Sequence, residues 1–320
     1  MSTPAGPPTW VLGARGLLGS HVVASLRRQP GAVLTTPVPW GAGARTRAAL
    51  TDGVRRLEAA ARGGPWQVAW CAGAGVVATT AEAMEEEQAS LRWLLQEIAD
   101  RPPLAGRGSM FLASSAGGVY AGSPQPPPFT ETSTTGALVA YGRAKLDMEE
   151  EVARFADATG TAALVGRIAN LYGPGQNLSK PQGLVSQLSR AHLTGQPVPI
   201  YVSLDTMRDY VYAADVGDLV ATGLHALRSR VARQPTAVVV KVIATGASLT
   251  IGSLIAHSTR HHRARPRVLV KAPDERSGQI RDLRLRSEVW PALDSHLRTP
   301  LLVGMARTAA DVAAQLRSSR

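Results

Sequence analysis

The chain has 320 residues, a formal net charge of +11 and a hydrophobic content of 44%, which allows one large domain or two modest ones with a core. No apolar run approaches the ~18 to 20 residues of a membrane span, the N-terminus lacks the basic start and apolar stretch of a signal peptide, and the single cysteine, Cys71, excludes an internal disulfide. We therefore expect a cytoplasmic protein without a membrane partner.

The excess of basic residues lies late in the chain, where residues 257–320 carry thirteen Lys and Arg against six Asp and Glu. A basic surface attracts nucleic acid and phosphorylated small molecules alike. Because the sequence has no nucleic-acid-binding motif and no basic segment interleaved with stacking aromatics, we expect no nucleic-acid partner.

Short apolar runs alternate with helical patterns through the first half of the chain. This alternation indicates an α/β fold, a doubly wound parallel sheet of the Rossmann type with helices on both faces. Cys71 ends one apolar run and is expected to be buried. The predicted strands lie at 10–12, 33–34, 67–71, 110–113 and 161–165, and the predicted helices at 17–28, 46–62, 80–100 and 137–158.

The pattern after Arg167 is less regular. A β-prone run at 237–243 is expected to return to the main sheet. Further helices are predicted at 183–193, 250–260 and 308–317, with a strand at 268–270. We therefore expect a dinucleotide-binding domain at 8–170, to which 207–246 returns, and a smaller C-terminal substrate-binding domain made of 171–206 and 247–320.

A glycine-rich loop, Gly13-Ala14-Arg15-Gly16-Leu17-Leu18-Gly19, follows the first predicted strand and opens the first helix. Its glycines permit a tight turn and close approach of a pyrophosphate, which the N–H groups and dipole of the helix N-terminus attract. An NAD site usually carries an acid after the second strand, but the first acid after this loop is Asp52. Arg15 and Arg45 suit a 2′-phosphate instead, so NADP is favoured, with NAD as the alternative.

Tyr141 and Lys145 stand at i and i+4 in a predicted helix and therefore share one helical face. An ammonium beside a phenol stabilises the phenolate. A tyrosine placed in this way can exchange a proton with a substrate oxygen.

These motifs resemble the extended short-chain dehydrogenase/reductase family, in particular its nucleotide-sugar epimerase, dehydratase and reductase branch. The resemblance covers nearly the whole chain, and its motifs occur in the family's order. Besides the glycine loop, it rests on the Ser-rich segment 112–120, the Tyr-x-x-x-Lys segment 141–145, and the segments 167–175 and 208–216.

The resemblance implies that Tyr141 is the general acid or base and that Lys145 holds the nicotinamide ribose. The position of the family's catalytic Ser or Thr is occupied by Ala116 in this chain. The resemblance therefore assigns that role to Ser115, with Ser114 as the second choice. Ser114 is also a candidate substrate contact. A homodimer is also implied. The predicted cofactor-binding residues are Gly13, Arg15, Gly16, Leu17, Leu18, Gly19, Arg45, Ala72 and Lys145.

On the substrate side, the resemblance implies that Asn170 and Arg208 hold a nucleotide diphosphate and that Arg276 reaches the same nucleotide, which suits guanidinium chemistry. Gln182 is predicted to lie on the substrate loop.

Two other clusters are assigned to solvated surface. His257 and His261 share a helical face, but their basic surroundings would repel a cation, so no metal site is expected. The acidic run 85–87 reads as an exposed helix face.

The reaction class also follows from the resemblance. Dehydratases of the family carry an Asp-Glu pair where this chain has Gly117 and Gly118, which cannot move protons, so redox chemistry at a single carbon remains. We expect NADP-dependent reduction of a keto group on a nucleotide-linked sugar. The alternatives are a nucleotide-sugar 4-epimerase with a transient ketone, a reductase of a non-sugar ketone, and an inactive nucleotide-binding or regulatory protein.

Overall fold

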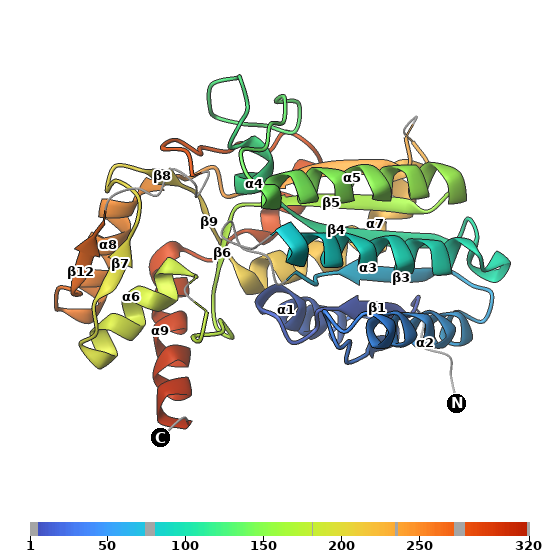
Figure 1. Cartoon of the computed structure of the whole chain (residues 1–320), viewed down its shortest axis with the longest axis horizontal. Helices are drawn as coiled ribbons and strands as arrows, with labels where there is room; N and C mark the ends of the chain where they lie inside the picture. The colour runs from blue at the N-terminus through green and yellow to red at the C-terminus, as the bar shows by residue number, and fades with distance from the viewer. Residues whose placement is uncertain (1–5, 74–80, 181, 234–235, 272–278, 319–320) are drawn as a thin grey trace.

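The computed structural model describes residues 6–73, 81–180, 182–233, 236–271 and 279–318. Its main sheet has six parallel strands: β1 (Thr9–Leu12), β2 (Val33–Thr35), β3 (Trp66–Trp70), β4 (Gly108–Ser115), β5 (Ala162–Ile168) and β10 (Val238–Ile243). Their order across the sheet is β10-β5-β4-β3-β1-β2 (Figure 1). The doubly wound α/β fold is therefore confirmed, and the 237–243 run does return to the main sheet beside β5.

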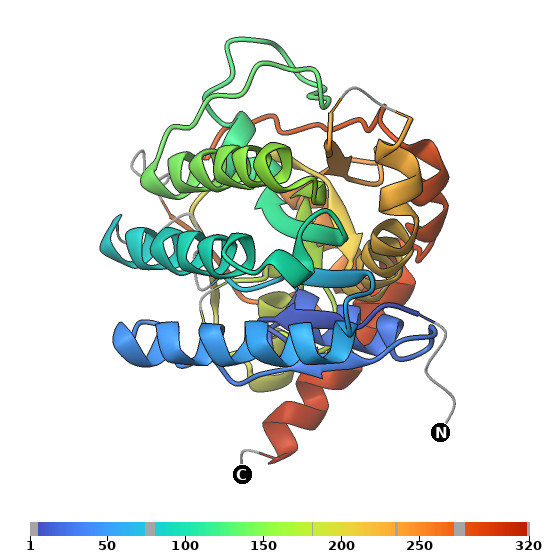
Figure 2. The same ribbon diagram turned by 90° about the vertical axis from the view of Figure 1, so that its right-hand side faces the viewer.

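Helices cover both faces of this sheet, because successive side chains of a strand point to opposite faces. Trp10 and Leu12 pack with α2 (Ala44–Ala61), α3 (Ala81–Ala99) and α5 (Ala140–Thr159), which run side by side in Figure 2. Val11 packs on the other face with α1 (Leu17–Leu26) and α7 (Ala213–Val231). Burial on both faces explains why the strands are almost continuously apolar.

Two helices and one cysteine differ from the expectation. Helix α7 was not predicted, although Val216, Val220 and Leu227 form part of a buried stripe at helical spacing. Helix α9 (Leu301–Ser318) begins seven residues before the predicted start. Cys71 is half-buried rather than buried, because it lies beyond the end of β3 at the edge of a cavity.

A smaller unit lies beside the carboxyl ends of the main strands (Figure 1). It has its own apolar cores, formed mainly by α6 (Leu184–Thr194), α8 (Ile251–His262) and α9, with the paired strands β7 (Val198–Ile200) and β12 (Val268–Val270). Further short pairs join β6 (Asn170–Tyr172) to β9 (Tyr210–Tyr212) and β8 (Met207–Arg208) to β11 (Leu249–Thr250). Within the described ranges, 3-10 helices span Pro102–Leu104 and Pro291–His296.

A buried lysine ties the C-terminal segment to the sheet. Lys241 of β10 is fully buried, and its Nζ donates to Ser287 Oγ at 2.8 Å and to the Val289 carbonyl at 2.7 Å. Asp294 Oδ1 lies 2.7 Å from the same ammonium. This cation is therefore held inside the fold by three oxygen atoms.

None of the helices in the described ranges is both long and apolar enough to cross a bilayer.

Candidate active site

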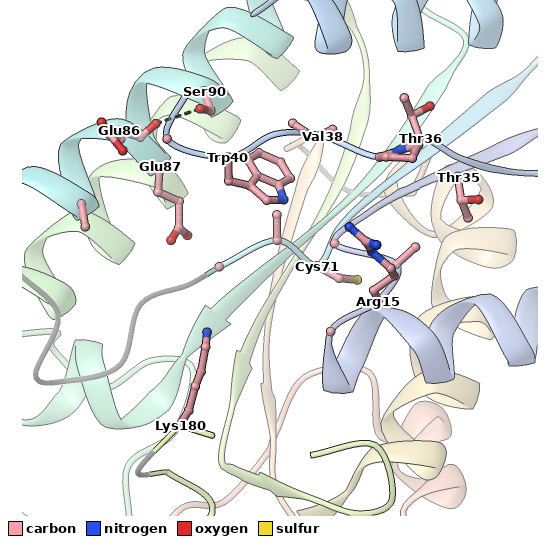
Figure 3. Close-up of a pocket in the computed structure, with 18 residues that line it drawn as sticks. Arg15, Thr35, Thr36, Val38, Trp40, Cys71, Glu86, Glu87, Ser90 and Lys180 are labelled. Carbon is pink, nitrogen blue, oxygen red and sulfur yellow. Dashed lines mark hydrogen bonds between the residues drawn. The ribbon is translucent and has the colours of Figure 1, made fainter. Parts of the chain in front are cut away.

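A cavity of about 540 Å³ opens at the carboxyl ends of β1, β2 and β3. The strand order reverses at β1, since β2 lies on one side and β3 on the other, and such a switch point is where open α/β sheets bind ligands. Figure 3 shows Arg15, Cys71 and Trp40 around the cavity, with Glu87 from α3 and Lys180 from the smaller unit at one end.

The glycine loop forms one wall of this cavity. Gly13 has a φ of +77°, and a Cβ there would lie 2.6 Å from the backbone nitrogen of Ala72. A Cβ at Gly19 would lie 2.1 Å from the carbonyl oxygen of Gly13. Helix α1 then begins at Leu17 with no side-chain cap. Its first N–H groups are thus directed at a tightly turned loop, which suits a pyrophosphate anion.

The predicted cofactor residues divide into two sets. Gly13, Arg15, Gly16 and Ala72 line the cavity, whereas Leu17, Leu18, Gly19 and Arg45 are not among its lining residues. Leu18 is buried in the core, and Arg45 lies exposed in the first turn of α2. The first residues of the loop therefore line the cavity, and its last ones pack α1 against the sheet.

The wall after β2 carries hydroxyl and apolar groups in place of a carboxylate. Thr35, Thr36, Pro37 and Val38 line it. Arg56, which the sequence analysis did not single out, donates from Nη1 to Thr36 Oγ1 at 3.3 Å. A guanidinium at this wall was not visible in the sequence, because Arg56 lies twenty residues away on α2.

Tyr141 and Lys145 lie together in the first turns of α5, and the Lys145 ammonium is 5.8 Å from the centroid of the Tyr141 ring. The short helix α4 (Ala116–Tyr120) packs against them. A Cβ at Gly118 would lie 3.0 Å from Tyr141 Cε1, and one at Gly142 would lie 2.2 Å from the Gly118 carbonyl oxygen. The two glycines thus allow α4 and α5 to approach closely, which fixes the tyrosine beside α4.

Glu87 lies in a different environment from the one that the sequence predicted. Its Oε1 accepts a hydrogen bond from Lys145 Nζ at 2.7 Å, and the two side chains are only 8% and 5% exposed. The expectation of a solvated face at residues 85–87 is wrong for this residue, whereas Glu85 and Glu86 are exposed. Helices α3 and α5 pack side by side, and only this packing brings the carboxylate to the lysine.

The charge balance at Lys145 follows from this contact. Burial works against the ammonium, but the neighbouring Glu87 carboxylate and then Tyr141 outweigh it, so the pKa of Lys145 is raised above its usual value. Lys145 therefore stays protonated across the neutral range. It can stabilise a developing negative charge on the tyrosine oxygen.

The two serines after β4 have different partners. Ser115 caps α4, where its Oγ accepts from the Gly118 N–H at 3.2 Å, and none of the described residues accepts its own proton. Ser114 Oγ donates to Glu149 Oε1 inside the protein, and Glu149 is paired with the buried Arg167. The Ser114 hydroxyl therefore already has an acceptor inside the core.

Two of the predicted substrate residues, Arg208 and Asn170, lie on the short strands β8 and β6. Arg208 is 7% exposed and donates to the Met207 carbonyl at 2.8 Å, and burial lowers its pKa. Asn170 Nδ2 donates to the Asp209 carbonyl at 2.9 Å. Gln182 is half-buried just before α6. Arg276 lies outside the described residues.

The histidines near the end of α8 are not simply a solvated face. His262 stacks on His192 of α6, with ring centroids 4.1 Å apart, and His261 packs edge-on against His262. His257 instead pairs with Arg260. Among the described residues, no group of three His, Cys, Asp or Glu side chains could hold a metal ion.

Comparison with known proteins gives a consistent picture. A family model described as the NAD dependent epimerase/dehydratase family matches residues 9–240. The chain is 30% identical over 125 residues to a dTDP-L-rhamnose 4-epimerase of Burkholderia thailandensis, and 30% identical over 107 residues to a dTDP-4-dehydro-6-deoxyglucose reductase of Escherichia coli. These matches cover 39% and 33% of this chain, and only 32% and 33% of the relatives.

A solved structure extends the likeness in fold to almost the full chain. The protein MoeE5, in complex with UDP-glucose and NAD, superposes with a TM-score of 0.77 at 22% identity. The match covers 97% of this chain and 100% of that one. The likeness at this level of identity concerns the fold.

Proposed function

This chain belongs to the NAD-dependent epimerase/dehydratase family, and from that premise we propose that it reduces a keto group on a nucleotide-linked sugar with NADPH. The observation that carries the proposal is the Tyr141–Lys145 pair, in which the ammonium lies 5.8 Å from the centroid of the phenol ring and 2.7 Å from Glu87, a residue of the cavity lining. The reductase among the relatives supports this choice.

The residues of the chain have distinct tasks in this reaction. When bound, the dinucleotide supplies a hydride to the carbonyl carbon. Tyr141 donates its phenolic proton to the carbonyl oxygen, and the Lys145 ammonium stabilises the phenolate that remains. Ser115 uses its free proton to hydrogen-bond the same oxygen. Gly117 and Gly118 offer no acid or base, so elimination of water is not part of the proposal.

The proposed preference for NADP rests on the walls of the cavity. Arg15 lines it, no carboxylate follows β2 in the segment Thr35–Val38, and Arg56 reaches Thr36. Guanidinium groups favour a 2′-phosphate. We expect Arg15→Gln to weaken NADPH binding about tenfold, the value of one charge-assisted hydrogen bond, and NADH binding much less. Arg55→Gln, on the exposed side of α2, is the control.

A nucleotide diphosphate arm of the substrate is proposed at the junction of the two units. Arg208 and Asn170 are the candidate contacts there. Titration of the protein with UDP and dTDP tests this assignment, and Arg208→Lys should weaken binding of either nucleotide, because an ammonium cannot make the bidentate contact of a guanidinium. Equal binding by the variant would remove Arg208 from the site.

The second candidate is a 4-epimerase, which the other relative favours. Stoichiometry separates the two reactions, since a reductase consumes one NADPH per product and an epimerase shows no net change in cofactor. Tyr141→Phe should reduce turnover about 10²- to 10⁴-fold, the usual contribution of a general acid, with NADPH affinity retained. If the wild-type protein binds NADPH and turns over neither sugar nucleotides nor simple ketones, it is a binding protein.

The oligomer is proposed from the family resemblance, and the compartment from the composition of the sequence. We propose a cytoplasmic homodimer. Light scattering of the purified protein would contradict the dimer if it gave a mass near 33.7 kDa.

A further inference from the structure

Glu87 lines the cavity and carries an oxygen that nothing in the described chain uses. Its Oε1 holds Lys145, but its Oε2 is buried and has no hydrogen-bond partner among the described residues. A buried carboxylate oxygen without a partner is costly, because the lost hydration is not replaced. The position of Glu87 in the cavity lining indicates that a ligand supplies the missing donor.

The Lys145–Glu87 pair faces the cavity through a gap left by a glycine. Gly73 follows β3, and a Cβ there would lie 3.4 Å from Glu87 Oε1, 3.7 Å from Oε2 and 3.7 Å from Lys145 Nζ. Any side chain at this position would therefore cover the pair. Glu87 and Gly73 both line the cavity, whereas Lys145 lies behind them with 5% of its side chain exposed.

The path of a bound dinucleotide decides what meets this oxygen. The pyrophosphate belongs at the glycine loop, and the adenosine ribose belongs at the end of β2. The other arm must run toward Tyr141, because the hydride is transferred where the proton is donated. The sugar of that arm lies between the pyrophosphate and the reacting ring. A dinucleotide bound in this way would carry that sugar past the end of the cavity where Glu87 lies, and its two hydroxyl groups could donate hydrogen bonds to a carboxylate oxygen.

We infer that Glu87 is a cofactor-binding residue, whose Oε2 accepts a hydrogen bond from a hydroxyl of the second ribose of the dinucleotide while Oε1 holds Lys145. The inference rests on the proposed function, since it requires a dinucleotide in this cavity. Lys145, to which the family resemblance assigns the same ribose, then acts there together with Glu87 and also on Tyr141. The carboxylate thus links cofactor binding to the position of the ammonium beside the general acid.

The test compares two ligand fragments by calorimetry, without turnover. 2′-Phospho-ADP-ribose carries the second ribose, and adenosine 2′,5′-bisphosphate lacks it. If NADH binds more tightly than NADPH, ADP-ribose and ADP are used as the corresponding pair. Glu87→Gln should weaken the ribose-bearing ligand about tenfold, since a bond to a charged acceptor is lost, and leave the shorter ligand unchanged. Glu85→Gln, on the exposed face of the same helix, should bind both like the wild type.

A second variant keeps the test valid if Glu87→Gln fails to fold. Gly73→Ala leaves the ion pair intact, because the added methyl group makes ordinary contacts with it, but covers it from the cavity. It should show the same selective loss of the ribose-bearing ligand. Equal binding of that ligand by the wild type and by either folded variant would overturn the inference. If the wild type binds neither fragment nor NADPH, the proposed function fails with it.

Discussion

Two buried lysines occupy opposite situations in this protein. Lys241 lies inside the fold behind β10, with three oxygen atoms around its ammonium. Lys145 lies beneath the cavity with one carboxylate partner, Glu87, whose other oxygen is left without a hydrogen bond in the described structure. Both are buried cations, but only the second has a partner that lines the cavity. The place of that partner thus separates a lysine held inside the fold from one beside a ligand-sized cavity.

The largest effect is expected from replacing the lysine held inside the fold. Lys241→Met leaves Asp294 and the Val289 carbonyl without their cation, and we expect a loss of about 3 kcal/mol of unfolding free energy, the low end for a broken buried pair, because Asp294 keeps some access to water. Urea denaturation measures it. Lys271→Met, at an exposed lysine, should change the unfolding free energy little, and a similar loss there would refute the comparison.

The second-largest effect is expected on the stabilisation of the protein by NADPH, which should differ between variants of the two lysines. NADPH at about 100 times its dissociation constant stabilises a protein by about 2.7 kcal/mol. We expect Lys241→Met to show the full increment at the wild-type ligand concentration, because its site is remote from the cavity. Lys145→Met should show a smaller increment, since its loss disturbs Glu87. Thermal melts with and without NADPH give both values, and equal increments would remove this difference between the two lysines.

A smaller effect is expected on the stability of the free protein when Lys145 is replaced. Lys145→Met leaves one acceptor, Glu87 Oε1, without its donor, whereas Lys241→Met removes the cation from three oxygen atoms. We therefore expect a loss of about 1–2 kcal/mol, the penalty for one unsatisfied group, against about 3 kcal/mol for Lys241→Met. Urea denaturation without ligand tests this, and the reverse order of the two losses would contradict it.

The smallest effect is expected from His262, whose ring stacks on that of His192. His262 has its pKa lowered to about 4 by burial and by His192 and His261. Because this pKa lies below the unfolded value of about 6.5, protonation favours unfolding. The contribution is complete above pH ~6.5 and is lost as the pH falls toward 4. His262→Phe should flatten the fall in melting temperature across this window, whereas His225→Asn, at an exposed position, should leave it unchanged.

The sequence by itself determined the parts of this protein that depend on local pattern. Alternating runs predicted the strands of the sheet, and spacing predicted that Gly13 and Gly16 open a helix and that Tyr141 and Lys145 share a face. These features follow from the period of a helix or strand and from the steric limits of a tight turn, so neighbouring residues suffice to define them.

Only the tertiary structure decided which side chains from distant segments meet. The packing of α3 against α5 carries Glu87 to Lys145 across 58 residues, and the same sheet directs Ser114 to Glu149 and away from the cavity. An acidic run reads as solvated surface until a neighbouring helix covers one of its members. Burial and partners are properties of the packed chain, and they turned Glu87 from an expected surface charge into the residue on which the inferred ribose contact depends.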